Sequence, residues 1–262
     1  MKKLISNLLK IIIFTVVLLL CLFVIIKCEG NEVSNKMHAW GFRRDGIGVR
    51  PILDKSANEV IEKYNGISIG NENEKIMYIT FDAGYEAGYT EKILDVLKKH
   101  NVKAAFFITG HYLNTAEELV KRMIVEGHIV GNHTVNHKCL VEISDEEIEK
   151  EIRKLDVALF EKFGYEMTYF RPPKGEFSER VIKKVSELGY KTVMWSSAYD
   201  DWDKDKQNRE EYGTKKILDN LHNGCVLLLH STSKDNANIL DNVITKIKED
   251  GYEIRSLNEF KN

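Results

Sequence analysis

Cysteine and proline are both scarce in this chain. Its 262 residues include four cysteines and three prolines, and no CxxC pair occurs. Four scattered cysteines do not indicate a disulfide scaffold, and the lack of paired thiols argues against a cysteine zinc site. No low-complexity tract or internal repeat is present. The formal net charge is −2, so the charge balance does not favour nucleic acid as a partner.

What remains is the composition of an ordinary globular enzyme. Charged residues make up 30% of the chain and aromatic residues 10%. The length allows one large α/β domain or two small ones. We expect a single catalytic domain and a monomer.

The N-terminal region differs from the rest of the chain. Lys2, Lys3 and Lys10 precede a charge-free run from Ile11 to Cys28 that only Lys27 breaks. The segment from Leu4 to Ile26 is long enough to cross a bilayer, which takes about 20 apolar residues. The positive flank predicts a cytoplasmic N-terminus and a catalytic body outside the cell membrane. A cleaved signal peptide is the alternative, although no small-residue cleavage site is evident. We therefore expect residues 1–28 to be a transmembrane anchor or a signal peptide, with the protein in the cell membrane or secreted.

One stretch sets the pattern for the body of the chain. The apolar residues before Asp82 predict a buried strand that carries this carboxylate at its C-terminal end, and a glycine turn follows. Later apolar runs end at His133, Arg171, Trp195 and His230. Polar groups at the ends of several strands are typical of an α/β barrel enzyme, in which these ends form one rim.

The alternation of strands and helices predicts parallel strands joined by crossover helices. We expect a distorted (β/α)7-type barrel over residues 67–262, preceded by an N-terminal extension over 29–66 that Trp40 attaches to the core. A doubly wound open sheet is the main alternative, but no GxGxxG follows the first strand. The strands are expected near 76–81, 102–108, 128–132, 167–170, 190–195, 225–229 and 252–255, and the helices near 57–64, 89–100, 115–126, 144–164, 178–188, 210–221 and 236–249.

Two short motifs could carry chemistry on this rim. His133 and His137 are four residues apart, which on a helical turn would place both imidazoles on one face, where they could bind one ion. Two polar loop histidines are the alternative. Arg171 precedes two prolines that stiffen the turn, so its guanidinium would be held at a fixed angle toward a carboxylate. The alternative for Arg171 is a salt bridge that only shapes the loop.

A third group involves Asp201 and His230. Asp201 lies in the polar loop after Trp195, and His230 ends an apolar strand. An aspartate that bonds one ring nitrogen could keep the imidazolium charged and leave the other nitrogen free to donate. A histidine that follows four apolar residues is otherwise often a satisfied core group.

Together these residues resemble the polysaccharide deacetylases of carbohydrate esterase family 4. The resemblance covers most of residues 76–260, and five motifs occur in the family's order. They are Thr80-Phe81-Asp82-Ala83, His133 to His137, Arg171-Pro172-Pro173, Asp201-Trp202 and Leu228-Leu229-His230. The pattern is most similar to the spore-associated branch that deacetylates muramic acid in peptidoglycan.

The resemblance implies a role for each matched residue. The catalytic residues would be Asp82 as general base, Arg171 to steer it, His230 as general acid and Asp201 to support it. The metal ligands would be His133 and His137. The substrate-binding residues would be Lys174, whose backbone N–H would hold the oxyanion, with Trp202 and Leu228 as walls of the acetyl pocket and Tyr85 beside them.

One position departs from the family pattern. Ala83 stands where the family has a second aspartate that completes the metal site, and a methyl group cannot bind a metal. The resemblance implies a divalent metal, zinc first and manganese, cobalt or magnesium otherwise, with uncertain occupancy. Water, or a nearby group such as Glu86 or Cys139, could take the third position.

We therefore expect a hydrolase that removes N-acetyl groups from peptidoglycan strands, with N-acetylmuramic acid as its substrate during formation of the muramic δ-lactam of spore cortex. A deacetylase of N-acetylglucosamine, chitin or xylan is a second hypothesis. A third is an inactive glycan-binding homologue, because Ala83 replaces a ligand.

Overall fold

A computed structural model describes residues 12–17, 33–203 and 205–261. The chain divides into two compact units, Met1–Ser34 and Asn35–Asn262. In the first unit residues 12–17 are helical, and residues 33–34 have no regular secondary structure.

The prediction of a single-pass membrane protein is corrected by this structure. No helix among the described residues is long and apolar enough to cross a membrane. Apart from residues 12–17, the segment from Leu4 to Ile26 lies outside the described residues.

The second unit is built on one parallel sheet of seven strands. Its strand order is β10-β4-β5-β6-β7-β9, and β11 also pairs with β4. The strands are β4 (Ile76–Ala83), β5 (Ala105–Ile108), β6 (Ile129–Asn132), β7 (Tyr169–Phe170), β9 (Lys191–Thr192), β10 (Cys225–His230) and β11 (Glu253–Ile254). The predicted α/β class with parallel strands is confirmed.

The sheet curls until its two ends meet. After β9 the chain bridges from Ser197 to Leu227 of β10, and the Leu228 N–H donates to the Ser197 carbonyl at 2.8 Å. This links the segment that follows β9 to β10, the first strand of the order, whereas an open doubly wound sheet would leave the two edges apart. The unit is thus an α/β fold with a curled parallel sheet.

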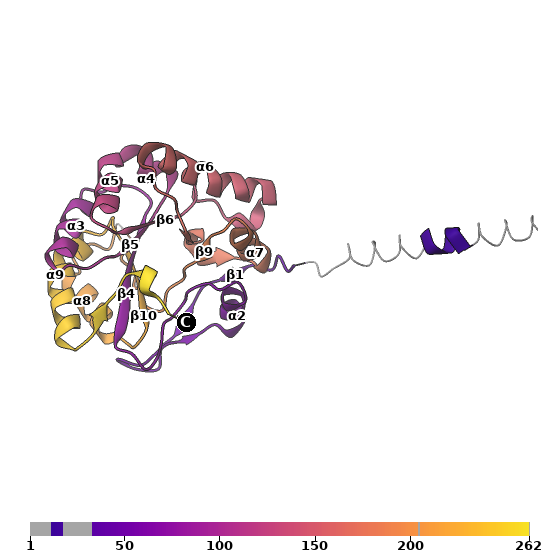
Figure 1. The fold of residues 1–262 in the computed structure, drawn as a ribbon. Helices are drawn as coiled ribbons and strands as arrows, with labels where there is room; N and C mark the ends of the chain where they lie inside the picture. The colour runs from indigo at the N-terminus through magenta and orange to yellow at the C-terminus, as the bar shows by residue number, and fades with distance from the viewer. Residues whose placement is uncertain (1–11, 18–32, 204, 262) are drawn as a thin grey trace, which may run out of the picture. The chain divides into compact units, whose positions relative to one another are not determined.

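Helices surround this sheet (Figure 1). They are α2 (Lys55–Lys63), α3 (Thr90–Lys99), α4 (Gly110–Thr115), α5 (Glu117–Val125), α6 (Asp145–Phe163), α7 (Glu179–Glu187), α8 (Glu210–Asp219) and α9 (Lys234–Glu249). Helix α4 was not predicted, because Gly110 was interpreted as the end of a strand. Thr109 begins this helix, since its side chain accepts a hydrogen bond from the Tyr112 N–H.

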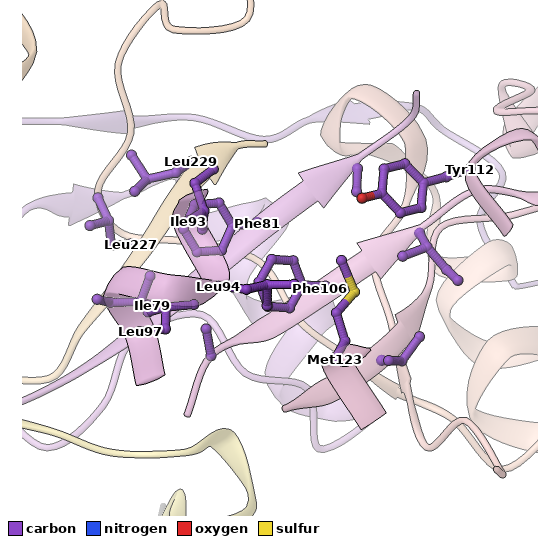
Figure 2. Close-up of a cluster of buried hydrophobic side chains, with 14 of the residues drawn as sticks. Ile79, Phe81, Ile93, Leu94, Leu97, Phe106, Tyr112, Met123, Leu227 and Leu229 are labelled. Carbon is purple, nitrogen blue, oxygen red and sulfur yellow. The ribbon is translucent and has the colours of Figure 1, made fainter. Parts of the chain in front are cut away.

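The core lies between the strands and these helices. Phe81 of β4 and Phe106 of β5 are fully buried, and their rings stack with centroids 5.0 Å apart. Leu94 of α3 and Leu229 of β10 belong to the same cluster (Figure 2). Burying apolar side chains on both faces gives the strands a rigid setting, so the groups at their ends are held in fixed positions.

Shorter pieces complete the unit. Three 3-10 turns, η1 (Leu140–Glu142), η2 (Pro173–Gly175) and η3 (Leu257–Glu259), lie in the described chain. Two small antiparallel sheets pair β1 (His38–Ala39) with β8 (Glu176–Phe177) and β2 (Phe42–Arg43) with β3 (Ile52–Leu53).

Trp40 attaches the N-terminal extension to the core, as predicted. Its side chain is buried, and its Nε1–H donates to the Trp195 carbonyl at 2.8 Å. The indole packs beside Phe177 of β8, with ring centroids 6.4 Å apart. The extension therefore lies against the strand segment that closes the sheet.

Candidate active site

Four polar side chains come from the carboxyl ends of strands in the same sheet. Asp82 lies near the end of β4 and His230 at the end of β10, and the register of this parallel pair sets them opposite each other. His133 directly follows β6, and Arg171 directly follows β7. Because the strands run in one direction, all four residues lie on one rim of the curled sheet.

Arg171 holds the Asp82 carboxylate in place. The guanidinium is fully buried, and its Nη1 donates to Asp82 Oδ1 at 2.8 Å. Its other nitrogens donate to Thr80 Oγ1 and to the carbonyl oxygens of Val193 and Met194. A guanidinium with this many fixed partners cannot swing, so it fixes the direction of the carboxylate.

The surrounding charge keeps Asp82 ionised. Burial alone would raise the pKa of Asp82, but the charge of Arg171, helped by His133 and His230, lowers it below its ordinary value. A carboxylate that remains deprotonated at neutral pH can accept a proton from water.

The pKa of His230 is shifted in the opposite direction to that of Asp82. Its Nδ1–H donates to Asp201 Oδ1 at 2.8 Å, and its backbone N–H donates to Asp201 Oδ2 at 2.7 Å. Burial alone would lower the pKa of His230, but the Asp201 carboxylate, with a smaller effect of Asp82, raises it above its ordinary value. The imidazolium is therefore favoured, and its Nε2–H is left to donate.

The two histidines of the HxxxH motif lie together. The ring centroids of His133 and His137 are 4.8 Å apart, and His133 Nε2 is 3.5 Å from Asp82 Oδ2. His133 Nδ1 donates to the Arg171 carbonyl at 2.9 Å, which leaves the Nε2 lone pair free. Burial lowers the pKa of both imidazoles, that of His137 to about 4. Both rings are thus neutral, as metal binding requires.

The loop between these histidines is not the predicted helical turn. Thr134 has a φ of 68° and His137 a φ of 56°, so both lie in the left-handed region. Asn132 Oδ1 accepts from the Thr134 N–H, and Thr134 Oγ1 accepts from the His137 N–H, both at 2.9 Å. These local side-chain bonds compete with helix formation and bring the two rings together through a tight turn.

Two neutral imidazoles suit a divalent metal, but the described residues supply no third ligand. No group of three or more His, Cys, Asp or Glu side chains that could hold a metal occurs among them. Glu86 instead caps α3 by accepting from the Tyr89 N–H at 2.9 Å, and it also accepts from the Tyr112 hydroxyl. Burial raises the pKa of the Cys139 thiol, which disfavours the thiolate. The two imidazoles could hold a divalent metal, but they form an incomplete site, because catalytic zinc usually has three protein ligands.

The site opens into a cleft of about 980 Å³. Its lining includes all four residues predicted to bind substrate, Tyr85, Lys174, Trp202 and Leu228. Trp202 is 63% exposed and Tyr85 46%, so both rings present an open apolar face to a ligand. Asp201 and Arg171 are buried behind the cleft and act through the residues they bond.

The cleft lining also includes His111 and Tyr199, which the sequence did not single out. Trp195, predicted to end an apolar run, lines the cleft as well. His111 lies on helix α4, and a Thr-capped start at Thr109 was the only sequence feature that could have revealed it. The part played by Asn236, which contacts Asp201, was missed as well.

A family model described as "Polysaccharide deacetylase" matches residues 69–193. The peptidoglycan-N-acetylmuramic acid deacetylase PdaA of Bacillus subtilis is 41% identical over 232 residues, which cover 88% of this chain and 88% of that protein. The solved structure of that enzyme, described as a family 4 carbohydrate esterase, has a TM-score of 0.84 at 42% identity. It covers 87% of this chain and 98% of the other.

Two more distant relatives differ in their described activities. The peptidoglycan-N-acetylglucosamine deacetylase PgdA of Listeria monocytogenes is 37% identical over 188 residues, covering 72% of this chain and 39% of that protein. A structure from Bacillus anthracis, described as a pseudoenzyme of the same esterase family, is 28% identical with a TM-score of 0.69, covering 74% of this chain and 68% of that one.

Proposed function

The chain belongs to the polysaccharide deacetylase family, carbohydrate esterase family 4, and is a hydrolase that acts on N-acetyl groups; on this premise we propose that it deacetylates peptidoglycan, at N-acetylmuramic acid. In this proposal the curled sheet is a distorted (β/α)7 barrel whose rim carries the reaction. The PdaA relative, similar over nearly the whole chain, is described as acting on that sugar, which supports the substrate.

One observation carries the reaction type: a base and an acid with opposite pKa shifts face the same cleft. The pKa of Asp82 is lowered, because the charge of Arg171 outweighs burial, and the pKa of His230 is raised, because Asp201 outweighs burial. Two titratable groups with pKa values driven apart are the arrangement that hydrolysis of an amide needs.

The reaction follows from these two groups. Asp82 takes a proton from water as the water oxygen attacks the acetyl carbonyl carbon, and the carbonyl oxygen becomes an oxyanion. The backbone N–H of Lys174 stabilises that oxyanion. His230 then donates its Nε2 proton to the amide nitrogen as the C–N bond breaks, which releases acetate and leaves a free amine on the sugar. Leu228 and Trp202 enclose the acetyl methyl group.

His133 and His137 are the residues that would hold a divalent metal, with zinc favoured and manganese, cobalt or magnesium as alternatives. Enzymes of the family are metal-dependent. A metal bound there would polarise the acetyl carbonyl and acidify the attacking water.

The Lys174 side chain supports the choice of sugar. Among the described residues that line the cleft, Lys174 is the single lysine or arginine, and its side chain is exposed. Muramic acid differs from glucosamine by a lactyl ether on O3, next to the N-acetyl group on C2, and this ether ends in a carboxyl group. An ammonium at the cleft attracts that carboxylate. After deacetylation the new amine and the lactyl carboxyl group of one sugar can condense to the muramic δ-lactam of spore cortex.

The direct test measures acetate released by the full-length chain from peptide-free peptidoglycan strands. Parallel samples contain chitin oligomers, N-acetylglucosamine glycans and acetylated xylan, each with added zinc, manganese or cobalt. The proposal expects release from muramic-acid-containing strands above all others. Release from chitin or xylan alone would replace the substrate, and no release from any glycan would refute the activity.

A second candidate is an inactive glycan-binding protein, which is considered because Ala83 stands where the family has a metal ligand. One relative of the same esterase family is described as a pseudoenzyme. A binding protein has no need for Asp82 and His230 with opposite pKa shifts. Glycan binding without acetate release from any substrate would favour this second candidate.

A further inference from the structure

Asp201 is held by a side chain that does not line the cleft. Asn236, in the first turn of α9, is 1% exposed. Its Nδ2 donates to Asp201 Oδ2 at 2.5 Å and to the His230 carbonyl at 3.1 Å. A single buried amide thus contacts both members of the Asp201–His230 pair.

Tyr199 fixes the orientation of this amide. Its hydroxyl donates to Asn236 Oδ1 at 2.5 Å, and burial raises the pKa of Tyr199, so the phenol keeps its proton. With a donor facing Oδ1 and two acceptors facing Nδ2, the Asn236 amide has one favourable orientation. Tyr199, Asn236, Asp201 and His230 form a continuous chain of hydrogen bonds.

A glycine in the middle of a helix makes room for this chain. Gly213 lies within α8, where glycine is less favourable than alanine. A Cβ at Gly213 would lie 2.8 Å from the Tyr199 hydroxyl and 3.0 Å from Ile239 Cδ1. Gly213 therefore lowers the stability of the helix and leaves space for the Tyr199 hydroxyl that donates to Asn236.

We propose that Asn236, oriented by Tyr199, is a positioning residue that holds Asp201 against His230, so that the imidazolium presents its proton to the departing amine. The proposal rests on the deacetylase function proposed above. The charged and titratable groups that face His230 are Asp201, Asp82, Arg171 and the imidazoles of His133 and His137, while Asp235 and Arg209 lie near Tyr199. Asn236 adds no charge to this set, so its effect is on geometry.

The deciding variant is Asn236→Leu, which keeps a similar side-chain volume and removes the Nδ2 donor. Without Asn236, Asp201 turns away from His230 part of the time, and the pKa of His230 falls. An NMR titration of the His230 ring in the full-length chain measures this without substrate. If the chain is inactive on every glycan, that result counts against the proposed function. The NMR titration still tests the role of Asn236. A pKa of His230 equal to or above that of the wild type would overturn the proposal.

The kinetic readout separates positioning from binding. Asn236→Leu should lower kcat about tenfold or more and change KM by less than about twofold, because Asn236 does not touch the cleft. An unchanged kcat would overturn the proposal. Asn236→Asp keeps the shape in case the leucine variant does not fold. The carboxyl group at position 236 can replace the amide N–H only while it shares a proton with the Asp201 carboxyl group. As the pH rises and this proton is lost, kcat should decline at a lower pH than in the wild type. A wild-type pH profile of kcat for Asn236→Asp would also overturn the proposal.

Tyr212 offers a matched control in the same region. Its hydroxyl donates to Asp200 at 3.1 Å, and its ring packs edge-on against Tyr199 with centroids 6.2 Å apart. Tyr199→Phe should lower both kcat and the pKa of His230, whereas Tyr212→Phe should leave both unchanged. Equal effects of the two variants would show that the surroundings of Tyr199, and not its bond to Asn236, set the geometry.

Discussion

The two sides of the cleft are held by different kinds of structure. The proposed base, Asp82, belongs to a fully buried strand, and Arg171, which directly follows another strand of the same sheet, donates to it. The proposed acid, His230, also ends a strand, but its partner Asp201 comes from an irregular segment and contacts Asn236. In this proposal the strands position the base, whereas side chains outside the cleft position the acid.

This difference has consequences for stability. Arg171 is 0% exposed, while Trp202, directly after Asp201, is 63% exposed. Segments with few buried contacts open more readily than core strands. We therefore expect changes on the base side to affect folding together with activity, and changes on the acid side to affect activity first.

The largest effect is expected from replacing the proposed base, Asp82. Asp82→Asn removes the proton acceptor, so acetate release should fall by about 10³-fold or more. The amide keeps the shape of the carboxyl group, and glycan binding should be retained. Acetate kinetics and a glycan-binding titration test both statements. Unchanged turnover would remove Asp82 from its role.

A smaller effect is expected at the metal ligands. His137→Ala should weaken binding of zinc by about 100-fold or more, because two protein ligands already form an incomplete site. Calorimetry with zinc measures this directly. His111→Ala is the control for a cleft histidine outside the motif and should keep the zinc affinity. A loss in the His111 variant as large as that in the His137 variant would make His111 a ligand.

The smallest effect concerns specificity. Lys174→Ala should raise KM for muramic-acid-containing strands by roughly tenfold, the scale of one charge-assisted contact. KM for N-acetylglucosamine glycans should not change, and Lys174→Arg should behave like the wild type toward both. Equal changes of KM for both glycans would show that the ammonium does not recognise the lactyl carboxylate.

Much of the sheet could be predicted, because a buried strand is an apolar run and a polar residue marks its end. The apolar runs before Asp82, His133, Arg171 and His230 end within about two residues of the ends of β4, β6, β7 and β10. Helix α4 was missed because Gly110 resembles a stop, and the turn at Thr134 was missed because positive φ at a β-branched residue is not visible in a spacing.

The remaining errors have other physical origins. The membrane prediction rested on the apolar length and on the positive flank, and the described residues contain no helix that could span a bilayer. The role of Asn236 could not be predicted from the sequence. Its amide contacts the Asp201 carboxylate, and no motif or residue spacing indicates such a contact. Such contacts depend on tertiary structure.

The central claim is that Asp201 keeps His230 protonated as the acid of the reaction. It is tested most directly by the pH dependence of kcat/KM for acetate release, measured for the wild type and for Asp201→Asn. Because Asp201 raises the pKa of His230 above its ordinary value of 6.5, the wild-type rate should decline on the alkaline side only above pH 6.5. In Asp201→Asn this decline should move to lower pH. A decline at the same pH in both proteins would contradict the account.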